Sequence, residues 1–131
     1  MRLYLDTSAL VKMVVAEPQS VALRDYLRDY SADSPFTAAL SRTELVRAVA
    51  SAGPAAVTAA RMLLDELEMV TLSRAVLDDA ASLSPRQLRS LDAIHLTAAL
   101  RAESSLRAVV TYDARMSSAA SGLGLSTAAP A

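Results

Sequence analysis

The 131-residue sequence predicts an α/β fold, a three-layer α/β/α domain in which a short parallel sheet is flanked by helices. Three observations support this prediction. Short apolar segments with high β propensity alternate with helical segments from one end of the chain to the other. No linker, repeat or low-complexity tract interrupts the alternation, apart from an enrichment in alanine. The length suits one domain, which we expect to span residues 1–131.

The chain opens with an apolar strand, RLYL at residues 2–5, which leads directly into helical sequence. Asp6, Thr7 and Ser8 at this junction are all residue types that cap helix N-termini. A second helix is expected to begin at Pro18, because proline suits the first turn of a helix.

The middle of the chain predicts a short strand at residues 36–37 and a helix over residues 39–52. That helix should end at Gly53, because glycine commonly terminates helices. A further helix over residues 55–68 leads into a strand at residues 69–73, where apolar and β-branched residues predominate.

Two helices are expected next, over residues 74–83 and 88–104, with a break at Pro85. The segment AVVTY at residues 108–112 is the most strand-like in the chain. A helix follows to about Ala120, and the last residues form a short strand or a tail. Such alternation implies parallel strands, and ligands of such sheets bind beyond the carboxyl ends of the strands.

Composition excludes several classes of protein. The chain has no cysteine, which removes disulfides, thiolate zinc sites and cysteine nucleophiles. Its three glycines cannot form a dinucleotide-binding or P-loop motif. The formal net charge of −1 lacks the strong positive field of a non-specific nucleic-acid binder. Because His95 is the only histidine, titratable chemistry must depend mainly on carboxylates.

Four acids stand in positions that suggest function. Asp6 and Asp113 each follow a predicted strand directly, so both should lie at the carboxyl edge of a parallel sheet. Glu44 lies in the middle of a helix, and Asp92 directly precedes the most apolar helical run. Carboxylates that converge would repel one another, and a hard divalent cation such as Mg²⁺ or Mn²⁺ would relieve the repulsion.

Each of these residues also has an ordinary structural explanation. Asp6 and Asp113 could serve only as helix caps. Glu44 could pair with Arg42 or Arg47 on an exposed helix face. Asp92 could pair with Arg89 or cap its helix in the same way. His95, on an apolar helix face, is expected to be a buried and hydrogen-bonded histidine. The functional interpretation rests on the coincidence of four such acids.

At these residues the chain resembles the PIN-domain ribonucleases and, among them, the VapC-type toxins of bacterial toxin–antitoxin pairs. The similarity covers essentially the whole chain and follows the family's order and spacing. The matching segments are LYLDTSALVKMVVAE, SRTELVRA, LRSLDAIHLTAAL and VVTYDARM.

The resemblance implies a PIN-like fold and a Mg²⁺- or Mn²⁺-dependent endoribonuclease whose metal site and catalytic acids are Asp6, Glu44, Asp92 and Asp113. Family toxins cut tRNA, rRNA or mRNA and arrest translation and growth. The implied partners are a cognate VapB-type antitoxin and a second copy in a homodimer. Promoter DNA would be bound only through the antitoxin.

The resemblance also gives expected roles to neighbouring residues. Ser8 and Thr111 match family hydroxyls that orient carboxylates or water. Arg47 and Arg115 are candidates for contacting phosphate or balancing charge. Some PIN domains carry a further acid a few residues after the last one, whereas here residues 115–118 after Asp113 are Arg-Met-Ser-Ser. This departure predicts three strong ligands and one peripheral acid.

The same sequence argues against two other functions of α/β proteins. A receiver domain and a haloacid-dehalogenase-type phosphatase both need a lysine late in the chain, whereas the only lysine is Lys12. A catalytically silent PIN-like binding module remains the alternative. No stretch of sequence is long and apolar enough for a membrane span, and with no export signal the cytoplasm is the expected location.

Overall fold

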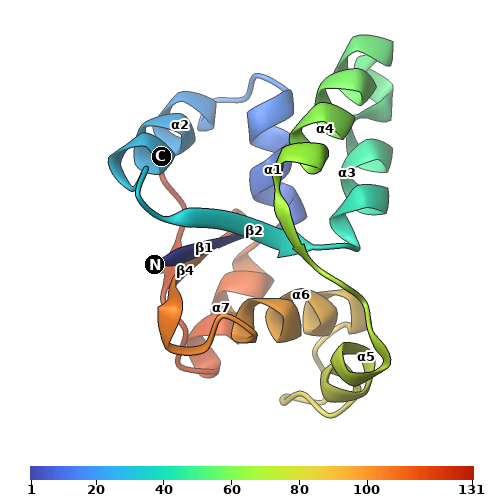
Figure 1. Cartoon of the computed structure of the whole chain (residues 1–131), viewed down its shortest axis with the longest axis vertical. Helices are drawn as coiled ribbons and strands as arrows, with labels where there is room; N and C mark the ends of the chain where they lie inside the picture. The colour runs from blue at the N-terminus through green and yellow to red at the C-terminus, as the bar shows by residue number, and fades with distance from the viewer.

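The computed structural model describes residues 1–131 and contains a five-stranded parallel sheet in the order β3-β2-β1-β4-β5 (Figure 1). From β1 the chain adds β2 and β3 on one side and then returns to add β4 and β5 on the other. The neighbours β1 and β4 therefore form a topological switch point, where ligands bind in open α/β sheets. The strands are β1 Arg2–Leu5, β2 Ser34–Ala38, β3 Glu68–Val70, β4 Leu106–Val110 and β5 Thr127–Ala128.

Helices cover both faces of the sheet, as the sequence predicted. In Figure 1 helices α1 to α4 lie above the sheet and α5 to α7 lie below it. None of them is long and apolar enough to cross a membrane. The helices are α1 Thr7–Val14, α2 Ser20–Asp29, α3 Ser41–Val49, α4 Pro54–Glu66, α5 Arg74–Ala81, α6 Ser90–Leu100 and α7 Ala114–Gly122.

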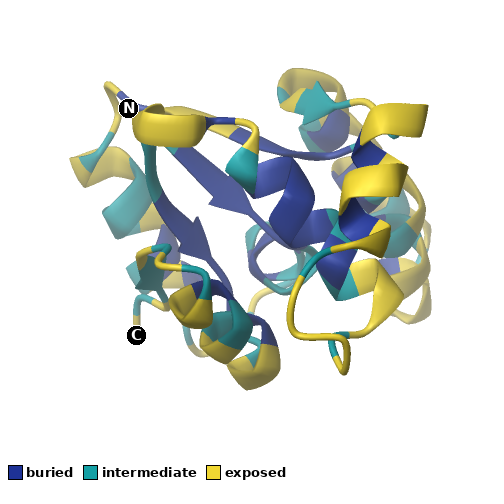
Figure 2. Cartoon of the chain, turned by 90° about the horizontal axis from the view of Figure 1, so that it is seen from below, coloured by how far each residue is buried: buried dark blue, intermediate teal, exposed yellow.

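The alternation of side chains along the strands divides the core into two clusters. Leu3 and Leu5 of β1 pack on the side of α1 to α4, whereas Tyr4 packs on the side of α6 and α7. Both faces of the central strands are therefore buried, and Figure 2 shows them dark blue between helices whose outer surfaces are exposed. Such two-sided burial explains why the strands read as continuous apolar runs.

Element boundaries differ from the predictions where local chemistry intervenes. Helix α2 begins at Ser20 rather than Pro18, because the Ser20 hydroxyl donates to the Val15 carbonyl and accepts from the Glu17 amide in the turn before it. The helix predicted over residues 39–52 becomes α3 and a 3₁₀ turn, and Gly53 then adopts φ 102° before α4. Strand β3 is also shorter than the predicted segment 69–73.

The amino end of the sheet is tied together by the buried carboxylate of Asp33, directly before β2. It accepts a hydrogen bond from the N-terminal ammonium at 3.1 Å, and it pairs with Arg107 of β4. Hydrogen bonding from Arg107 lowers the pKa of Asp33 below its ordinary value. The three central strands thus share one electrostatic contact.

We expect Asp33→Asn to lower the melting temperature at neutral pH, because the amide cannot make this ion pair. A lowered carboxyl pKa stabilises the fold above the ordinary value of 3.8 and loses that contribution as pH falls below it. The difference from wild type should therefore shrink in acid. Thermal melts from pH 7 to pH 3 test this, with exposed Asp29→Asn as control; a constant difference would contradict it.

Candidate functional site

The site begins at the carboxyl ends of β1 and β4, which lie side by side because Leu5 pairs with Val110. Asp6, one residue beyond β1, caps α1 and is only 3% exposed. Its Oδ1 accepts hydrogen bonds from the Ser8 hydroxyl at 2.6 Å and the Ala9 amide at 3.0 Å. Burial nevertheless raises the pKa of Asp6 above its ordinary value.

Ser8 and Thr111 both contact this carboxylate. The Thr111 hydroxyl donates to Oδ2 of Asp6 at 2.5 Å, across the gap between β4 and β1. The same two hydroxyls accept hydrogen bonds from the amides of Tyr112 and Asp113, at 2.8 Å and 3.1 Å. Both carboxylate oxygens of Asp6 are thus fixed, and the loop after β4 is tied to the start of α1.

Glu44 reaches the same edge from the first turn of α3. Its Oε1 accepts hydrogen bonds from the Thr7 hydroxyl at 2.8 Å and from His95 Nε2 at 2.5 Å. Burial disfavours the ionised carboxylate, but the His95 and Thr7 contacts outweigh that cost and lower the pKa of Glu44. Glu44 is therefore an anion held by α1 and α6 together.

Asp92 and Asp113 lie close enough to influence each other. Asp113 caps α7 and accepts from the amides of Arg115 and Met116. Asp92 occupies the first turn of α6, and burial together with the negative charge of Asp113 raises its pKa. Arg89 and Arg115 counteract this rise only in part.

The four acids carry little compensating charge. Among the ion pairs of the chain, only His95–Glu44 involves one of them. Asp92 forms no ion pair with Arg89, and Glu44 forms none with Arg42 or Arg47. Asp6, Asp92 and Asp113 therefore lack a cationic side-chain partner. Their unpaired negative charge lies in a partly buried place.

This donor set suits a hard divalent cation. No three His, Cys, Asp or Glu side chains approach closely enough to enclose a metal ion. Mg²⁺ commonly uses one or two carboxylates and completes its coordination with water and substrate phosphate, so it does not need such a cage. Carboxylate oxygens that lack cationic partners are consistent with that mode of binding.

The two arginines singled out from the sequence lie in different places. Arg115 lines a pocket of about 550 Å³ between α7 and the segment before α6, together with Asp92. Arg47 lines a separate hollow on α3 and α4 that none of the four acids borders. The first pocket is also lined by Arg89, for which the sequence suggested only an ion pair with Asp92.

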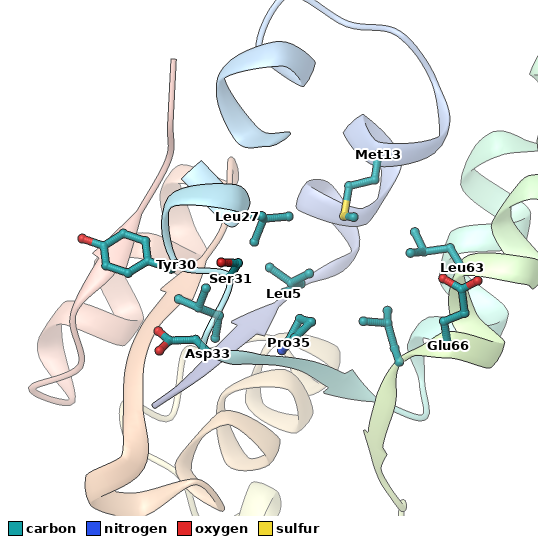
Figure 3. A pocket seen from close by; sticks show the side chains of 11 residues that line it. Leu5, Met13, Leu27, Tyr30, Ser31, Asp33, Pro35, Leu63 and Glu66 are labelled. Atoms are coloured by element: carbon teal, nitrogen blue, oxygen red, sulfur yellow. The ribbon is translucent and has the colours of Figure 1, made fainter. Parts of the chain in front are cut away.

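A further hollow, of about 300 Å³, lies between α2 and α4, on the face of the sheet that α1 to α4 cover (Figure 3). Its walls are mostly apolar, and Leu5, Met13, Leu27 and Leu63 point into it. None of the four acids contributes to it. It therefore has no part in the chemistry of the acidic edge.

Thr7 and Tyr4 contact the site but had no functional signal in the sequence. Thr7 looked like a helix cap and donates to Glu44 instead. Tyr4 looked like an ordinary strand residue, yet its hydroxyl contacts His95 Nδ1 at 2.6 Å. His95 is buried and hydrogen-bonded, as expected, and its second ring nitrogen contacts Glu44.

Known proteins are similar to this chain in sequence and in fold. A family model described as PIN domain matches residues 3–122. Ribonuclease VapC46 of Mycobacterium tuberculosis is 44% identical over 98% of this chain and 97% of its own length. Ribonuclease VapC47 of the same species is 43% identical over 98% and 96%. The crystal structure of M. tuberculosis VapC20, a sarcin-ricin loop cleaving toxin, superposes with a TM-score of 0.67 at 16% identity, over 89% of this chain and 94% of that one.

Proposed function

The chain belongs to the PIN-domain family and, within it, to the VapC ribonucleases, and from this premise we propose that its acidic edge hydrolyses RNA with a divalent cation. The protein is a ribonuclease toxin, and the alternative of a silent binding module is not favoured. The observation that supports the metal dependence is that Asp6 and Asp113, which follow β1 and β4, and Asp92 of α6 all lack an ion-pair partner.

We assign Asp6 and Asp92 as direct metal ligands, with Glu44 beside them and Asp113 binding directly or through water. When bound, Mg²⁺ or Mn²⁺ would supply an acidified water and offset charge on the phosphoryl oxygens. Ser8 and Thr111 keep Asp6 in one orientation through the hydrogen bonds described above. Thr7 and His95 do the same for Glu44.

In the proposed reaction a water oxygen forms a bond to the scissile phosphorus, and the bond from phosphorus to the 3′-oxygen breaks. The water gives up a proton with help from a carboxylate, and the leaving 3′-oxygen takes up a proton. The products are a 3′-hydroxyl and a 5′-phosphate. Inactivation of tRNA, rRNA or mRNA in this way would inhibit translation.

The pocket beside Asp92 supplies a place for the RNA backbone. Arg89 and Arg115 border it without ion-pair partners, and both act on the pKa of Asp92. Guanidinium groups bind phosphate well because their fork of donors matches its oxygens. We propose that these two side chains contact phosphates next to the scissile bond, whereas Arg47 lies outside this pocket.

We expect Arg89→Ala and Arg115→Ala each to raise KM about fivefold with a smaller change in kcat, since one contact worth roughly 1 kcal/mol is lost. Each substitution should also reduce the dependence of binding on salt. Steady-state cleavage of a labelled RNA at two salt concentrations measures both effects. Arg24→Ala, an exposed arginine on α2, is the control, and an equal effect there would contradict the assignment.

The proposed partners follow from the family. A VapB-type antitoxin is expected to bind and inhibit the toxin, two copies are expected to form a homodimer, and promoter DNA is expected to be bound only through the antitoxin. The proposed location is the cytoplasm.

The RNA target is found by induced expression followed by sequencing of RNA ends. We expect new 5′-phosphate ends at one or a few sites in cells that express the wild-type protein. Asp92→Asn should produce none of them, because it removes a proposed ligand without changing side-chain size. Equal cleavage by that variant would remove Asp92 from the site.

A further inference from the structure

A buried chain of hydrogen bonds crosses the edge of the sheet from β1 to α3. The Tyr4 hydroxyl lies 2.6 Å from His95 Nδ1, and His95 Nε2 lies 2.5 Å from Glu44 Oε1. Tyr4 is 0% exposed and His95 3%. In Figure 1, α6 lies below the sheet and α3 above it, so this chain connects the two helical layers.

The polar atoms permit one consistent arrangement of protons with a neutral imidazole. An ionised Glu44 can only accept, so Nε2 of His95 must donate to it. Nδ1 then carries a lone pair and accepts from the Tyr4 hydroxyl. Burial raises the pKa of Tyr4, which keeps the phenol proton in place for this bond.

Packing fixes the imidazole in this orientation. The ring of His95 meets Tyr4 edge to face, with centroids 6.0 Å apart, and Tyr4 meets Phe36 in the same way at 5.2 Å. Glu44, in contrast, has a long and partly exposed side chain with several rotamers. Its Oε1 receives both protein hydrogen bonds, and Oε2 receives none.

We propose that His95, oriented by Tyr4, is a positioning residue that holds Glu44 Oε1 so that Oε2 stays free for the proposed metal site. The Thr7 hydroxyl supports the same oxygen from α1. The consequence for catalysis rests on the proposed function, but the hydrogen-bond chain itself does not. Partners of this kind affect metal affinity because they remove conformational freedom from a ligand.

The first test uses the fact that His95 is the only histidine. Long-range ¹H–¹⁵N correlation spectra of the metal-free protein at neutral pH contain a single imidazole. We expect the proton on Nε2 and a hydrogen-bonded, unprotonated Nδ1. Tyr4→Phe should move the Nδ1 resonance toward that of a free lone pair, and Glu44→Gln should move the Nε2 proton resonance. A proton on Nδ1 alone in the wild-type protein would overturn the proposal.

The second test measures function through the metal. We expect Tyr4→Phe to weaken Mn²⁺ binding, measured by titration calorimetry, and to lower kcat, each by about tenfold, with KM for RNA unchanged. His95→Gln, whose amide can still donate to Glu44, should retain more Mn²⁺ affinity than His95→Leu. Tyr26→Phe on α2, whose hydroxyl makes no protein hydrogen bond, is the matched control. Thermal melts establish that each variant is folded.

The two proposals fail in different ways. If the wild-type protein cleaves RNA with metal but folded Tyr4→Phe and His95→Leu match it in Mn²⁺ affinity and kcat, the positioning role is wrong and the proposed function stands. If the wild-type protein binds no Mn²⁺ and cleaves no RNA, the metal-dependent function is wrong, and the role of His95 toward a metal site fails with it.

Discussion

An Asp6→Asn protein is expected to lose RNA cleavage by on the order of a hundredfold or more while remaining folded. Asp6 lies at the centre of the edge, where Ser8, Thr111 and the Ala9 amide fix its two oxygens. Asparagine keeps the shape of the side chain but removes the negative charge that a divalent cation needs. Single-turnover cleavage of RNA in excess Mg²⁺ measures the loss.

The same substitution should raise the melting temperature of the metal-free protein. Burial raises the pKa of Asp6, so at neutral pH the fold bears the cost of a buried charge without a cationic partner. For a carboxyl with a raised pKa this cost is absent below its ordinary value and complete above its raised value. Melts in EDTA should therefore show a stabilised variant at pH 7 and a smaller difference in acid.

Asp78→Asn provides the control, since Asp78 is an exposed acid on α5 without an ion pair. It should change neither cleavage nor the melting temperature. An Asp6→Asn protein that unfolds, or one that cleaves RNA at the wild-type rate, would contradict the assignment of Asp6 as a metal ligand. Lost activity with gained stability is the result that separates a functional acid from a structural helix cap.

Removal of divalent metal is expected to reduce cleavage to the background of uncatalysed hydrolysis. The acidic edge offers carboxylates and hydroxyls but no nucleophilic cysteine, and its only histidine is engaged with Glu44 and Tyr4. With EDTA present, RNA should stay intact over the time in which the untreated enzyme consumes it. Addition of Mg²⁺ or Mn²⁺ in excess over EDTA should restore the rate.

Two controls define this experiment. An Asp6→Asn sample carried through the same steps reports any contaminating nuclease, and circular dichroism in EDTA reports whether the metal-free protein keeps its fold. We expect the spectrum to be unchanged, because the core clusters on both faces of the sheet contain none of the four acids. Full activity in EDTA would refute metal dependence.

The sequence predicted the fold class and the edge on which the acids lie. Local patterns carried this information, because apolar runs marked the strands and an acid followed each of two runs. Asp6 directly follows β1, whereas Asp113 lies three residues beyond the end of β4, which spans Leu106–Val110 rather than the predicted 108–112. In a parallel sheet the end of every strand lies at the same edge, so no knowledge of strand order was needed to place these two acids together. Membership of the PIN-domain family agrees with the predicted fold class.

Other parts of the site had no local signal. Thr7, Tyr4 and Arg89 read as a cap, a strand residue and an ion-pair partner. Their contacts or positions depend on which helix packs beside which strand. The Thr7–Glu44 bond spans 37 residues and the Tyr4–His95 bond 91 residues, so neither follows from the periodicity of one segment.

By itself, then, the sequence determined the alternation of strands and helices, the layer structure and the absence of cysteine from the candidate site. These features depend on local propensity and on which side chains the chain contains. The tertiary structure decided the rest. It placed β1 beside β4, so that Thr111 reaches Asp6 across 105 residues, and it brought α3 and α6 from opposite faces to one edge, where His95 meets Glu44. These contacts form only when the whole chain is packed, since burial of both faces of the sheet fixes the neighbours of each helix.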